Sequence, residues 1–355
     1  MKTVVMMAGG TGGHVFPALA VAKEWQARGY QVHWLGGEHG IEQRLVPAAG
    51  YPLKALTVKG LRGGSLLHKM MAPWMIFAAI REARAWLKDV NPVLVMGFGG
   101  YASGPGGLAA RWCGIPLVIH EQNAIPGFTN RVLSRFATLT LAAFEGAFPS
   151  GFPVVGNPVR EEILALEAPT QRYAEREGAL RLLVLGGSQG ALALNTQLPP
   201  VLAKVLKGES VIIRHQAGRN RRDETLAAYK GTQLNAQVDE FIEDMAAAYA
   251  WADLVISRAG ALTISELAAA GVAALCVPLP TAADDHQTHN AQWLASFGAA
   301  RVLPQAELNE MELQQQLMDI FERDKLAQMA ERGRQALALN SAKRVVDLSE
   351  ELLHG

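Results

Sequence analysis

Short apolar runs recur along the chain, and longer segments with helical spacing of apolar residues separate them. The first run, Thr3 to Ala8, ends in glycines and is followed by a predicted helix at Pro17–Arg28. Buried parallel strands are near-continuous apolar runs of this kind. In the first half the pattern predicts further strands at Gln31–Leu35, Pro52–Leu56, Val93–Met96, Pro116–His120, Ala137–Leu141 and Pro153–Val155. It predicts further helices at Leu66–Lys88 and Ser103–Trp112.

The second half repeats the alternation of strands and helices. Strands are predicted at Leu182–Leu185, Val211–His215, Ala236–Val238, Leu254–Ser257 and Ala274–Val277. Helices are predicted at Leu192–Leu206, Met245–Trp251, Leu262–Ala270, His286–Phe297 and Glu307–Phe321. Such alternation is typical of βαβ units on a parallel sheet. We therefore predict an α/β fold with two doubly wound parallel sheets in tandem and a ligand in the cleft between them.

The domain boundary is predicted at Gly156-Asn157-Pro158, where glycine and proline interrupt the pattern. A chain of 355 residues is long enough for two domains, each with its own core. Residues 341–355 are predicted to form a last amphipathic helix, capped by Asn340 or Ser341. Its apolar positions need a partner surface that the sequence does not identify: Val345, Val346, Leu348, Leu352 and Leu353.

Charge is unevenly distributed, although 33 Lys+Arg and 33 Asp+Glu give a net charge of zero. Residues 1–157 contain 14 Lys+Arg and 7 Asp+Glu, which makes the first half basic and the remainder acidic. A basic half favours an anionic partner, but no helix-turn-helix, zinc spacing or RNP-like motif indicates nucleic acid. Cys113 and Cys276 form no CxxC pair, which is typical of a reducing cytosol. No signal peptide is visible, and the longest apolar stretch, Met70–Ile80, is shorter than the roughly 20 residues of a spanning helix.

Two glycine turns follow predicted strands: Gly9-Gly10-Thr11-Gly12-Gly13-His14 and Gly186-Gly187-Ser188-Gln189-Gly190-Ala191. Because glycine has no Cβ, a phosphate can approach its backbone, and the N-terminus of the following helix attracts the anion. His14 is at the mouth of the first turn, where open α/β sheets present ligands. The alternative is a tight turn with an incidental histidine.

Two other predicted strands of the first half end in polar or glycine-rich stretches. Gly97 to Gly107 is compatible with a ligand loop or with close packing of a helix on a strand. His120-Glu121-Gln122-Asn123 places four polar side chains directly after a strand. Burial of these groups without a function would be costly, so we favour a site there.

In the second half, Ser257 to Glu266 again combines a strand end, a glycine turn and a helix start. Glu266 is expected in the first turn of that helix, either as a capping residue or as the acceptor of hydrogen bonds from a ribose. Asp284 to Asn290 superficially resembles a metal cluster, but its ligand spacing is loose. Gln287 and Asn290 lie on one helix face and are better suited to sugar hydroxyls.

Together these motifs resemble the MurG family, bacterial transferases that add N-acetylglucosamine to undecaprenyl-pyrophosphoryl-MurNAc-pentapeptide. The resemblance covers essentially the whole chain, in order and spacing: Gly9–His14, Gly99–Pro105, His120–Asn123, Gly156–Arg160, Gly186–Ala191, Arg258–Glu266 and Asp285–Asn290. It implies a GT-B fold of two Rossmann-like domains with an inter-domain cleft. The acceptor-binding, membrane-facing domain would comprise residues 1–157 with helix 341–355, and the donor domain residues 158–340. The last helix would then pack on the first domain.

The resemblance also assigns roles to individual residues. It implies UDP-GlcNAc as the donor, with Ile242 contacting uracil through its backbone and Glu266 holding the ribose. The other implied donor contacts are Thr11, Gly12, Gly13, Asn123, Arg160, Ser188, Ala261, Leu262, Thr263, Ile264, Ser265 and Gln287. Gly10, Tyr101 and Asn123 are expected to contact the acceptor, the lipid-linked MurNAc-pentapeptide.

Transfer from a UDP-sugar leaves a diphosphate whose growing charge must be stabilised. No metal motif is evident, so we expect an inverting, metal-independent transferase without a cofactor. Helix N-termini at Ser188 and Thr263, helped by Arg160, would meet the charge. His14 is the candidate general base, because histidine has an intrinsic pKa of about 6.5. Alternatively His14 holds the acceptor pyrophosphate, and Glu121 is the base or orients His14.

Three other functions stay open from the sequence. A nicotinamide dehydrogenase needs a G-x-G-x-x-G spacing that the first glycine turn does not match. A UDP-sugar 2-epimerase would share the fold and the donor but needs no membrane-facing surface. A non-catalytic protein would bind the sugar nucleotide without transferring the sugar.

The predicted helix from Leu66 to Trp86 is apolar on two sides. One stripe suits a core (Leu66, Met70, Phe77 and Ile80), and the opposite side carries Leu67, Met71, Trp74, Met75 and Ala78. A helix that is apolar all round is usually buried, but this one is flanked by Arg62, Lys69, Arg81 and Arg84. A basic rim around an apolar patch is typical of proteins on an anionic leaflet. We therefore expect peripheral binding to the cytoplasmic face of the bacterial inner (plasma) membrane through Met71, Trp74 and Met75.

Overall fold

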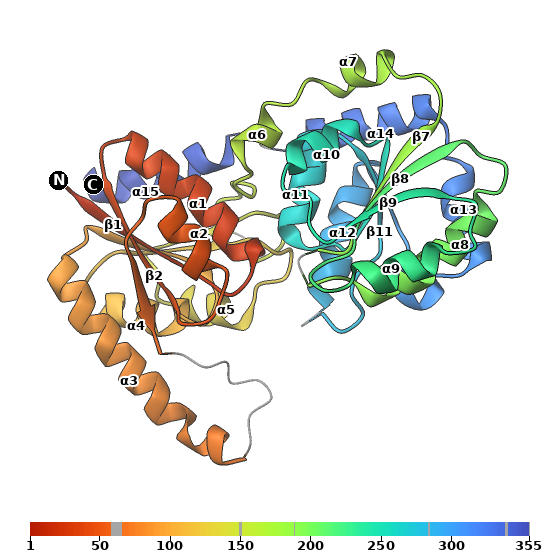
Figure 1. The fold of residues 1–355 in the computed structure, drawn as a ribbon. Coiled ribbons are helices and arrows are strands. Elements are labelled where there is room, and N and C mark those ends of the chain that lie inside the picture. Colours follow the sequence, from red (N-terminus) through yellow and green to blue (C-terminus); the bar gives the residue numbers. More distant parts are fainter. Residues whose placement is uncertain (58–65, 149–150, 188, 283–284, 338–339, 355) are drawn as a thin grey trace. The chain divides into compact units, whose positions relative to one another are not determined.

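The chain forms two compact units, each with its own parallel sheet and core (Figure 1). The computed structural model describes residues 1–355 except 58–65, 149–150, 188, 283–284, 338–339 and 355, and except the side chains of 66–72. The first unit comprises Met1–Arg160 with Asn340–Gly355, and the second comprises Glu161–Leu339.

The first unit is built on a six-stranded parallel sheet with the order β3-β2-β1-β4-β5-β6. Its strands are β1 (Thr3–Ala8), β2 (Gln31–Gly37), β3 (Leu53–Leu56), β4 (Leu94–Gly99), β5 (Leu117–Glu121) and β6 (Leu139–Ala142). Its helices are α1 (Gly12–Ala27), α2 (Glu42–Ala48), α3 (Leu66–Val90), α4 (Ser103–Trp112), α5 (Phe128–Leu133) and α15 (Ser341–His354). The strand order reverses between β1 and β4, which makes their carboxyl ends the switch point where such sheets bind ligands.

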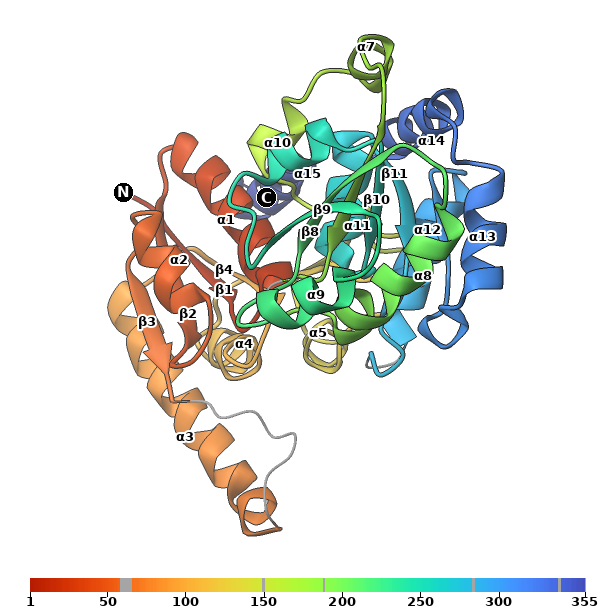
Figure 2. The same cartoon turned by 45° about the vertical axis from the view of Figure 1, so that its right-hand side comes forward.

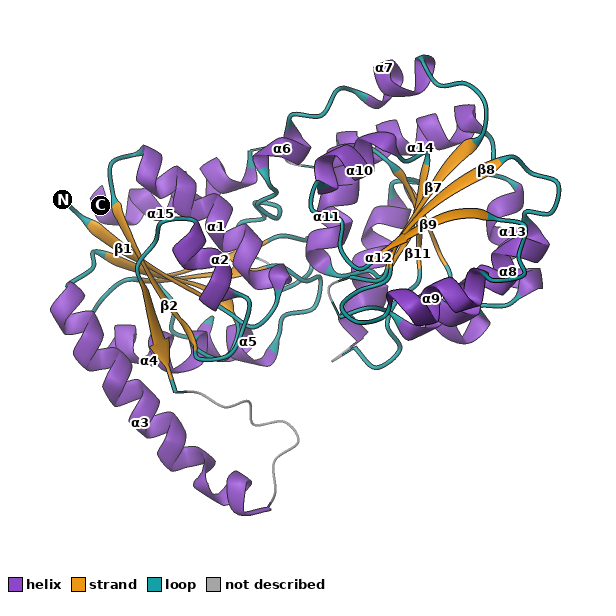
Figure 3. Ribbon diagram, in the orientation of Figure 1, coloured by secondary structure: helices purple, strands orange, loops and turns teal. Residues whose placement is uncertain are grey.

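Helices cover both faces of this sheet (Figure 3). Successive residues of a strand point to opposite faces. Accordingly Val4 and Met6 of β1 join a core cluster with α1, α2 and α15, whereas Val5 and Met7 join a second cluster with α3, α4 and α5. Burial on both faces explains why the strand is apolar at every position from Val4 to Ala8.

The C-terminal helix α15 packs on α1 of the first unit. Val345 and Val346 are completely buried in the core cluster that contains α1. At the C-terminal end of α1, Arg28 forms ion pairs with Asp347 at 2.6 Å and with Glu350 at 2.8 Å. The apolar face of the last helix thus has its partner surface within the first unit.

The second unit has a six-stranded parallel sheet with the order β12-β11-β10-β7-β8-β9. Its strands are β7 (Leu180–Leu185), β8 (Val211–Gln216), β9 (Asn235–Asp239), β10 (Leu254–Ser257), β11 (Ala273–Cys276) and β12 (Ala300–Val302). Its helices are α6 (Glu161–Leu164), α7 (Pro169–Ala174), the π-helix η1 (Ala193–Gln197), α8 (Leu198–Val205), α9 (Arg222–Tyr229), α10 (Met245–Trp251), α11 (Ala261–Ala270), α12 (His286–Ser296), the 3₁₀ turn η3 (Gln305–Glu307), α13 (Glu310–Met318) and α14 (Arg323–Ala336). The order reverses between β7 and β10, so these two strands mark the switch point of the second sheet.

Two groups of sequence predictions differ from the structure. The predicted strand Pro153–Val155 was wrong, because only a single bridge joins Val154 to Ala142. Proline lacks the N–H that a longer ladder would need at that point. The sequence pattern also missed β12 and the helices α2, α5, α6, α7, α9 and α14. Most of these are only one or two turns long, and helices of that length depend on tertiary packing.

Candidate active site

At the switch point of the first sheet, the glycine turn after β1 lies against a second glycine turn, the one after β4. Gly99 and Gly100, at the end of β4, have φ angles of +104° and +90°. A Cβ on Gly100 would lie 2.5 Å from the carbonyl oxygen of Gly9, and one on Gly99 would lie 2.9 Å from Cδ2 of His14. Both positions therefore need glycine, for the backbone conformation and for the close approach. This approach sets the β4 turn against the His14 ring.

His14 lies in the first turn of α1, which begins at Gly12 and not at the predicted Pro17. Extended Thr11 is the N-cap, and its carbonyl accepts the N–H groups of His14 and Val15 at 3.2 Å. The His14 ring places Nδ1 3.3 Å from the carbonyl oxygen of Gly9. Because a carbonyl only accepts, Nδ1 is the donor, and in the neutral ring the lone pair is on Nε2. A general base acting through Nε2 requires this tautomer.

A buried carboxylate that sequence reasoning missed lies against the first glycine turn. Glu42, at the start of α2, is 1% exposed and accepts the backbone N–H of Gly10 at 2.9 Å and of Gly37 at 3.1 Å. A Cβ on Gly9 would lie 2.5 Å from its Oε1, and one on Gly36 would lie 2.9 Å from its Cγ. The glycines therefore make room for the Glu42 carboxylate. The high number of glycines before Glu42 was the feature of the sequence that could have indicated its burial. Gly10 gives its N–H to Glu42, so this amide is not offered to a phosphate.

Glu42→Ala should lower the free energy of unfolding by roughly 2–6 kcal/mol, since two buried N–H groups would each lose a partner at about 1–3 kcal/mol. Urea titration followed by circular dichroism measures the loss. Glu38→Ala is the matched control, because Glu38 is exposed and bonds only an exposed side chain among the contacts described for it, that of Thr57. Equal urea midpoints for the two variants would contradict the structural role of Glu42.

Glu121 ends β5 and is 1% exposed. Its Oε1 accepts the backbone and side-chain N–H groups of Asn123 at 2.8 and 3.0 Å. Its Oε2 accepts the backbone N–H of Gly127 at 3.1 Å and the side-chain amide of Asn130 at 2.9 Å. Both oxygens therefore order the loop between β5 and α5. This arrangement favours a role in positioning Asn123 over a role in proton transfer.

His120 is completely buried and stacks on the ring of Phe98, with centroids 5.2 Å apart. Its Nε2 lies 3.0 Å from the carbonyl oxygen of Gly156, and Nδ1 lies 3.1 Å from the side-chain amide of Gln122. Burial lowers the pKa of His120 to about 4, so the ring is neutral near pH 7. His120 thus connects the β5 loop to the segment at Gly156. Because its two ring nitrogens are engaged in these contacts, His14 remains the candidate general base.

Four predicted site residues lie at or near these turns of the first unit: Tyr101, Arg160, Gly12 and Thr11. Tyr101, in the turn after β4, is 55% exposed. The guanidinium of Arg160 lies 5.1 Å from the centre of the Phe16 ring, which is a cation–π distance. A Cβ on Gly12 would lie 3.1 Å from the same ring. Arg160, Phe16 and Gly12 are therefore neighbours at the start of α1, and Thr11 is exposed beside them.

The glycine turn of the second unit follows β7. Gly187 and Gly190 have φ angles of +74° and +73°, and a Cβ on Gly190 would lie 2.5 Å from the Ala217 carbonyl oxygen. Ser188 lies outside the described residues. The following helix starts as the π-helix η1, in which Asn195 donates to the Ala217 carbonyl at 2.8 Å. π-helical turns are frequent at functional sites, and the apolar pattern from Leu192 did not reveal this one.

α11 begins at Ala261, with extended Gly260 as its N-cap. Glu266 is therefore in the second turn, and the prediction that placed it in the first turn, where it could cap the helix, was wrong. Its carboxylate is 4% exposed and accepts a hydrogen bond from the Tyr249 hydroxyl at 3.1 Å. Ile264 and Ser265 are buried, and Ser265 donates its hydroxyl to the Ala261 carbonyl at 2.9 Å. Leu262 and Thr263 are half-buried.

α12 supports the loop between β10 and α11. Oε1 of Gln287 accepts the backbone N–H groups of Ala259 and Leu279 at 3.3 and 3.0 Å. Asn290 is completely buried and donates to the Ala259 carbonyl at 3.1 Å. The prediction that Asn290 suits sugar hydroxyls was therefore wrong. Ile242, after β9, is 9% exposed.

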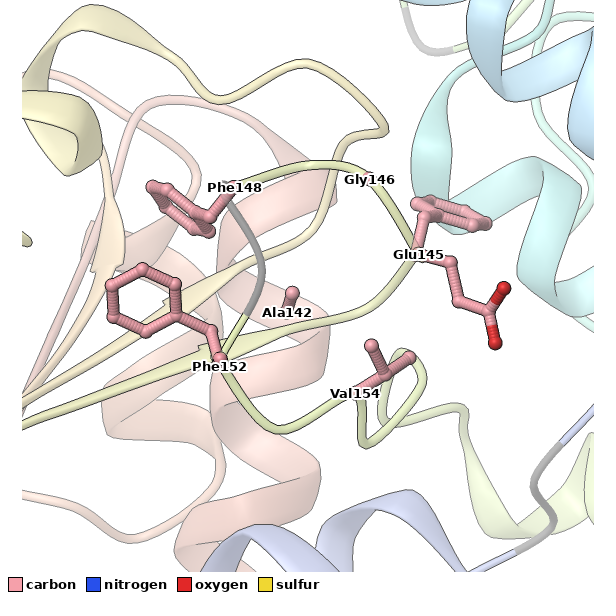
Figure 4. A pocket seen from close by; sticks show the side chains of 8 residues that line it. Ala142, Glu145, Gly146, Phe148, Phe152 and Val154 are labelled. Atoms are coloured by element: carbon pink, nitrogen blue, oxygen red, sulfur yellow. The ribbon is translucent and has the colours of Figure 1, made fainter.

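Among the described residues, which do not include Asp284, no group of three or more His, Cys, Asp or Glu side chains is arranged to hold a metal ion. A cavity of about 150 Å³ follows β6 in the first unit, with Phe148, Phe152 and Val154 in its lining (Figure 4). The Phe148 and Phe152 rings are 5.3 Å apart, and the Glu145 side chain points away from them. None of the predicted site residues lines this cavity.

Both halves of the chain match the same family of known proteins. The glycosyltransferase family 28 N-terminal domain matches residues 4–142, and the family 28 C-terminal domain matches residues 181–349. A relative from Alcanivorax borkumensis is 56% identical over an alignment of 356 positions that covers 99% of this chain and 99% of the relative. It is named UDP-N-acetylglucosamine–N-acetylmuramyl-(pentapeptide) pyrophosphoryl-undecaprenol N-acetylglucosamine transferase. The crystal structure of Acinetobacter baumannii MurG has a TM-score of 0.86 and 44% identity, and covers 99% of this chain and 100% of that one. This chain belongs to the MurG family.

Membership of the MurG family confirms the predicted GT-B fold, since each unit carries one six-stranded parallel sheet of the Rossmann type. A Staphylococcus aureus MnaA–UDP structure is similar in fold alone. Its TM-score is 0.70 and its identity 11%, and the match covers 100% of this chain and 97% of that one. The full-length MurG relatives give no support to an epimerase, a dehydrogenase or a non-catalytic binding protein.

In this MurG family member, α3 is only partly buried. Ile80 and Leu87 pack in the core, but Trp74 is 75% exposed and Phe77 is 44% exposed. The predicted core position of Phe77 was wrong, because the buried stripe of α3 runs through Ile76, Ile80, Ala83 and Leu87, and Phe77 lies to one side of it. The N-terminal half of α3 also extends beyond the sheet (Figures 1 and 2). Met75 is half-buried, and the Met71 side chain lies outside the described residues. In the part of the chain that the structure describes, no helix is long and apolar enough to cross a membrane.

Proposed function

We propose that this protein transfers N-acetylglucosamine from UDP-N-acetylglucosamine to undecaprenyl-pyrophosphoryl-MurNAc-pentapeptide, a step of peptidoglycan synthesis. The attacking group is the 4-hydroxyl of MurNAc, and the anomeric configuration inverts. The observation that carries the proposal is the 56% identity, over 99% of both chains, to the relative named for this transfer. The contacts of His14 and Glu266 support it.

The first unit, with α15, supplies the acceptor side in this proposal. The Nδ1–H of His14 donates to Gly9, so Nε2 takes the proton from the attacking hydroxyl. Glu121 holds Asn123 in place for the acceptor, and exposed Tyr101 contacts it from the β4 turn. Gly10 contributes only its open backbone surface, since its N–H is bonded to Glu42.

The second unit supplies the donor side in this proposal. Glu266 accepts the ribose hydroxyls, and Ile242 meets uracil through its backbone. The first turn of α11 contains no acidic residue, so its N–H groups and the positive end of the helix dipole favour the diphosphate. The remaining donor contacts are those that the family resemblance implies. In the second unit they are Ser188, Ala261, Leu262, Thr263, Ile264, Ser265 and Gln287, and the first unit adds Thr11, Gly12, Gly13, Asn123 and Arg160.

The deciding experiment adds lipid-linked MurNAc-pentapeptide to the protein with UDP-N-acetylglucosamine, with and without excess EDTA. We expect acceptor-dependent UDP release, a disaccharide lipid product by mass spectrometry, and equal rates with EDTA. UDP release without the disaccharide lipid would indicate hydrolysis and contradict the proposal. Binding of the donor without turnover would support a non-catalytic protein, and loss of activity that added metal restores would contradict metal independence.

We also propose that the protein binds the cytoplasmic face of the bacterial inner membrane through α3. Trp74 is exposed on the part of α3 that extends beyond the sheet, and Met75 lies beside it. Arg81, Arg84 and Lys88 of the same helix are exposed cations. Each cation near an anionic surface contributes about 1 kcal/mol of attraction. A lipid-linked acceptor requires such a surface, because its pyrophosphate is at the depth of the headgroups.

Trp74→Ser/Met75→Ser should bind phosphatidylglycerol vesicles at least about 10-fold more weakly than the parent, because burial of each apolar side chain contributes of the order of 1.5–3 kcal/mol. Sedimentation with vesicles measures the loss, and high salt should weaken binding of the parent. Met311→Ser/Met318→Ser is the matched control, since these methionines are 69% and 70% exposed in the second unit. Equal vesicle binding by both variants would place the docking surface elsewhere.

A further inference from the structure

Tyr249 is a buried tyrosine of α10 whose hydroxyl contacts the predicted ribose-binding carboxylate. Its side chain is 1% exposed, and the hydroxyl donates to Oε2 of Glu266 at 3.1 Å. Glu266 itself is 4% exposed, on α11, and α10 packs against α11. The two residues are 17 positions apart, so the contact exists only in the folded unit.

A buried arginine fixes the two helices that carry this pair. Arg172 of α7 donates to the backbone carbonyl of Tyr249 at 3.4 Å and to the carbonyls of Ala270 and Gly271, at the C-terminal end of α11. Burial lowers the pKa of Arg172 to about 10, which leaves the guanidinium charged near pH 7. One cation therefore holds the backbone of Tyr249 in register with the helix of Glu266.

We infer, on the basis of the proposed function, that Tyr249 is a positioning residue that makes the donor site selective for a ribonucleotide. A carboxylate receives both hydroxyls of a ribose well only in one rotation about its terminal bond, and that bond is soft. The Tyr249 hydroxyl restrains this rotation by holding Oε2. It also supplies a hydrogen bond to a charge that is costly to bury. Tyr249 acts through Glu266 and does not itself touch the nucleotide.

A tyrosine that merely fills the core would affect all nucleotides equally, whereas a positioning residue affects only ligands with ribose hydroxyls. Calorimetric titration with UDP and with 2′,3′-dideoxy-UDP separates these roles, because the second ligand gives Glu266 no hydroxyl to accept. Tyr249→Phe removes one oxygen and keeps the ring. Tyr173→Phe is the matched control: Tyr173 is 5% exposed in the same unit and donates to the backbone carbonyl of Asp253 at 2.8 Å.

We expect Tyr249→Phe to weaken UDP binding roughly 10-fold, the size of one hydrogen bond to a charged group, and to leave dideoxy-UDP binding within about 2-fold. The preference for UDP should therefore fall roughly 10-fold, and Tyr173→Phe should leave that preference unchanged. In the Glu266→Gln background, Tyr249→Phe should change the preference little, because the residue through which it acts is already altered. This background also avoids a buried carboxylate without its tyrosine partner, so it provides a test if the single variant folds poorly.

An unchanged preference in Tyr249→Phe would overturn the inference, as would an equal loss of affinity for both ligands. A full effect of Tyr249→Phe in the Glu266→Gln background would show that Tyr249 acts without Glu266 and would likewise overturn it. If the parent binds no UDP, the proposed donor is wrong, and the inference falls with it. UDP titration and transfer assays of the parent therefore distinguish failure of the proposed function from failure of the positioning role of Tyr249.

Discussion

His14→Ala should lower kcat by roughly 10²–10⁴-fold, the usual contribution of a general base, with little change in the KM for UDP-N-acetylglucosamine. The donation from Nδ1 to Gly9 leaves the Nε2 lone pair to accept the proton of the acceptor hydroxyl. The base acts only in the chemical step, so the loss falls on kcat. Initial rates of UDP release at saturating donor and acceptor measure it.

His39→Ala is the matched control for this change, because His39 is exposed in the loop after β2. Its kcat should equal that of the parent. A His14→Ala enzyme that keeps most of its kcat would refute the assignment of the base. The role would then pass to Glu121, although its two oxygens already accept four hydrogen bonds, three from the β5–α5 loop and one from Asn130 of α5.

Glu266→Gln should raise the KM for UDP-N-acetylglucosamine about 10- to 100-fold and leave kcat at saturating donor much less affected. Replacing the carboxylate removes the charge from hydrogen bonds to the ribose, each worth about 1.5–3 kcal/mol when charged. The structure excludes a capping role, because Glu266 is in the second turn of α11. Donor titrations of the rate, together with UDP binding by calorimetry, measure the effect.

Glu310→Gln is the control for this change, since Glu310 is an exposed glutamate on α13 of the same unit. It should bind UDP like the parent. If Glu266→Gln also binds UDP like the parent while its thermal unfolding is unchanged, the ribose role is wrong. The same measurement gives the reference for Tyr249→Phe, whose effect should be the smaller of the two because it acts through Glu266.

The predictions that agree with the structure rest on local patterns. Ser103–Trp112, Met245–Trp251 and Leu254–Ser257 have the predicted bounds, because their apolar positions are strong and glycine, proline or a polar residue adjoins their ends. The glycine turns after β1 and β7 were visible for the same reason. Predictions on Ser188 and on the Met71 side chain lie outside the described residues and stay predictions.

The errors arise where a distant contact outweighs the local pattern. Phe77 fits a core stripe on its own helix, but the face of α3 that packs in the core runs through Ile76, Ile80 and Leu87 instead. Asn290 is polar on a helix face, but that face is buried against the loop at Ala259. The misplacement of Glu266 has a different origin, in counting along the helix: α11 begins at Ala261, so Glu266 is its sixth residue and lies in the second turn.

The amino-acid sequence by itself determined the α/β class, the two parallel sheets and the family, because apolar runs, glycine turns and ordered motifs are written along the chain. Only the tertiary structure decided three hydrogen bonds. Gly10 donates its N–H to Glu42, His14 donates through Nδ1 to the Gly9 carbonyl, and the Tyr249 hydroxyl donates to Glu266. Gly10 and Glu42 are 32 positions apart, and Tyr249 and Glu266 are 17 apart. A side chain's partner at such separations is set by how helices pack on the sheet, and no local spacing of residues records it.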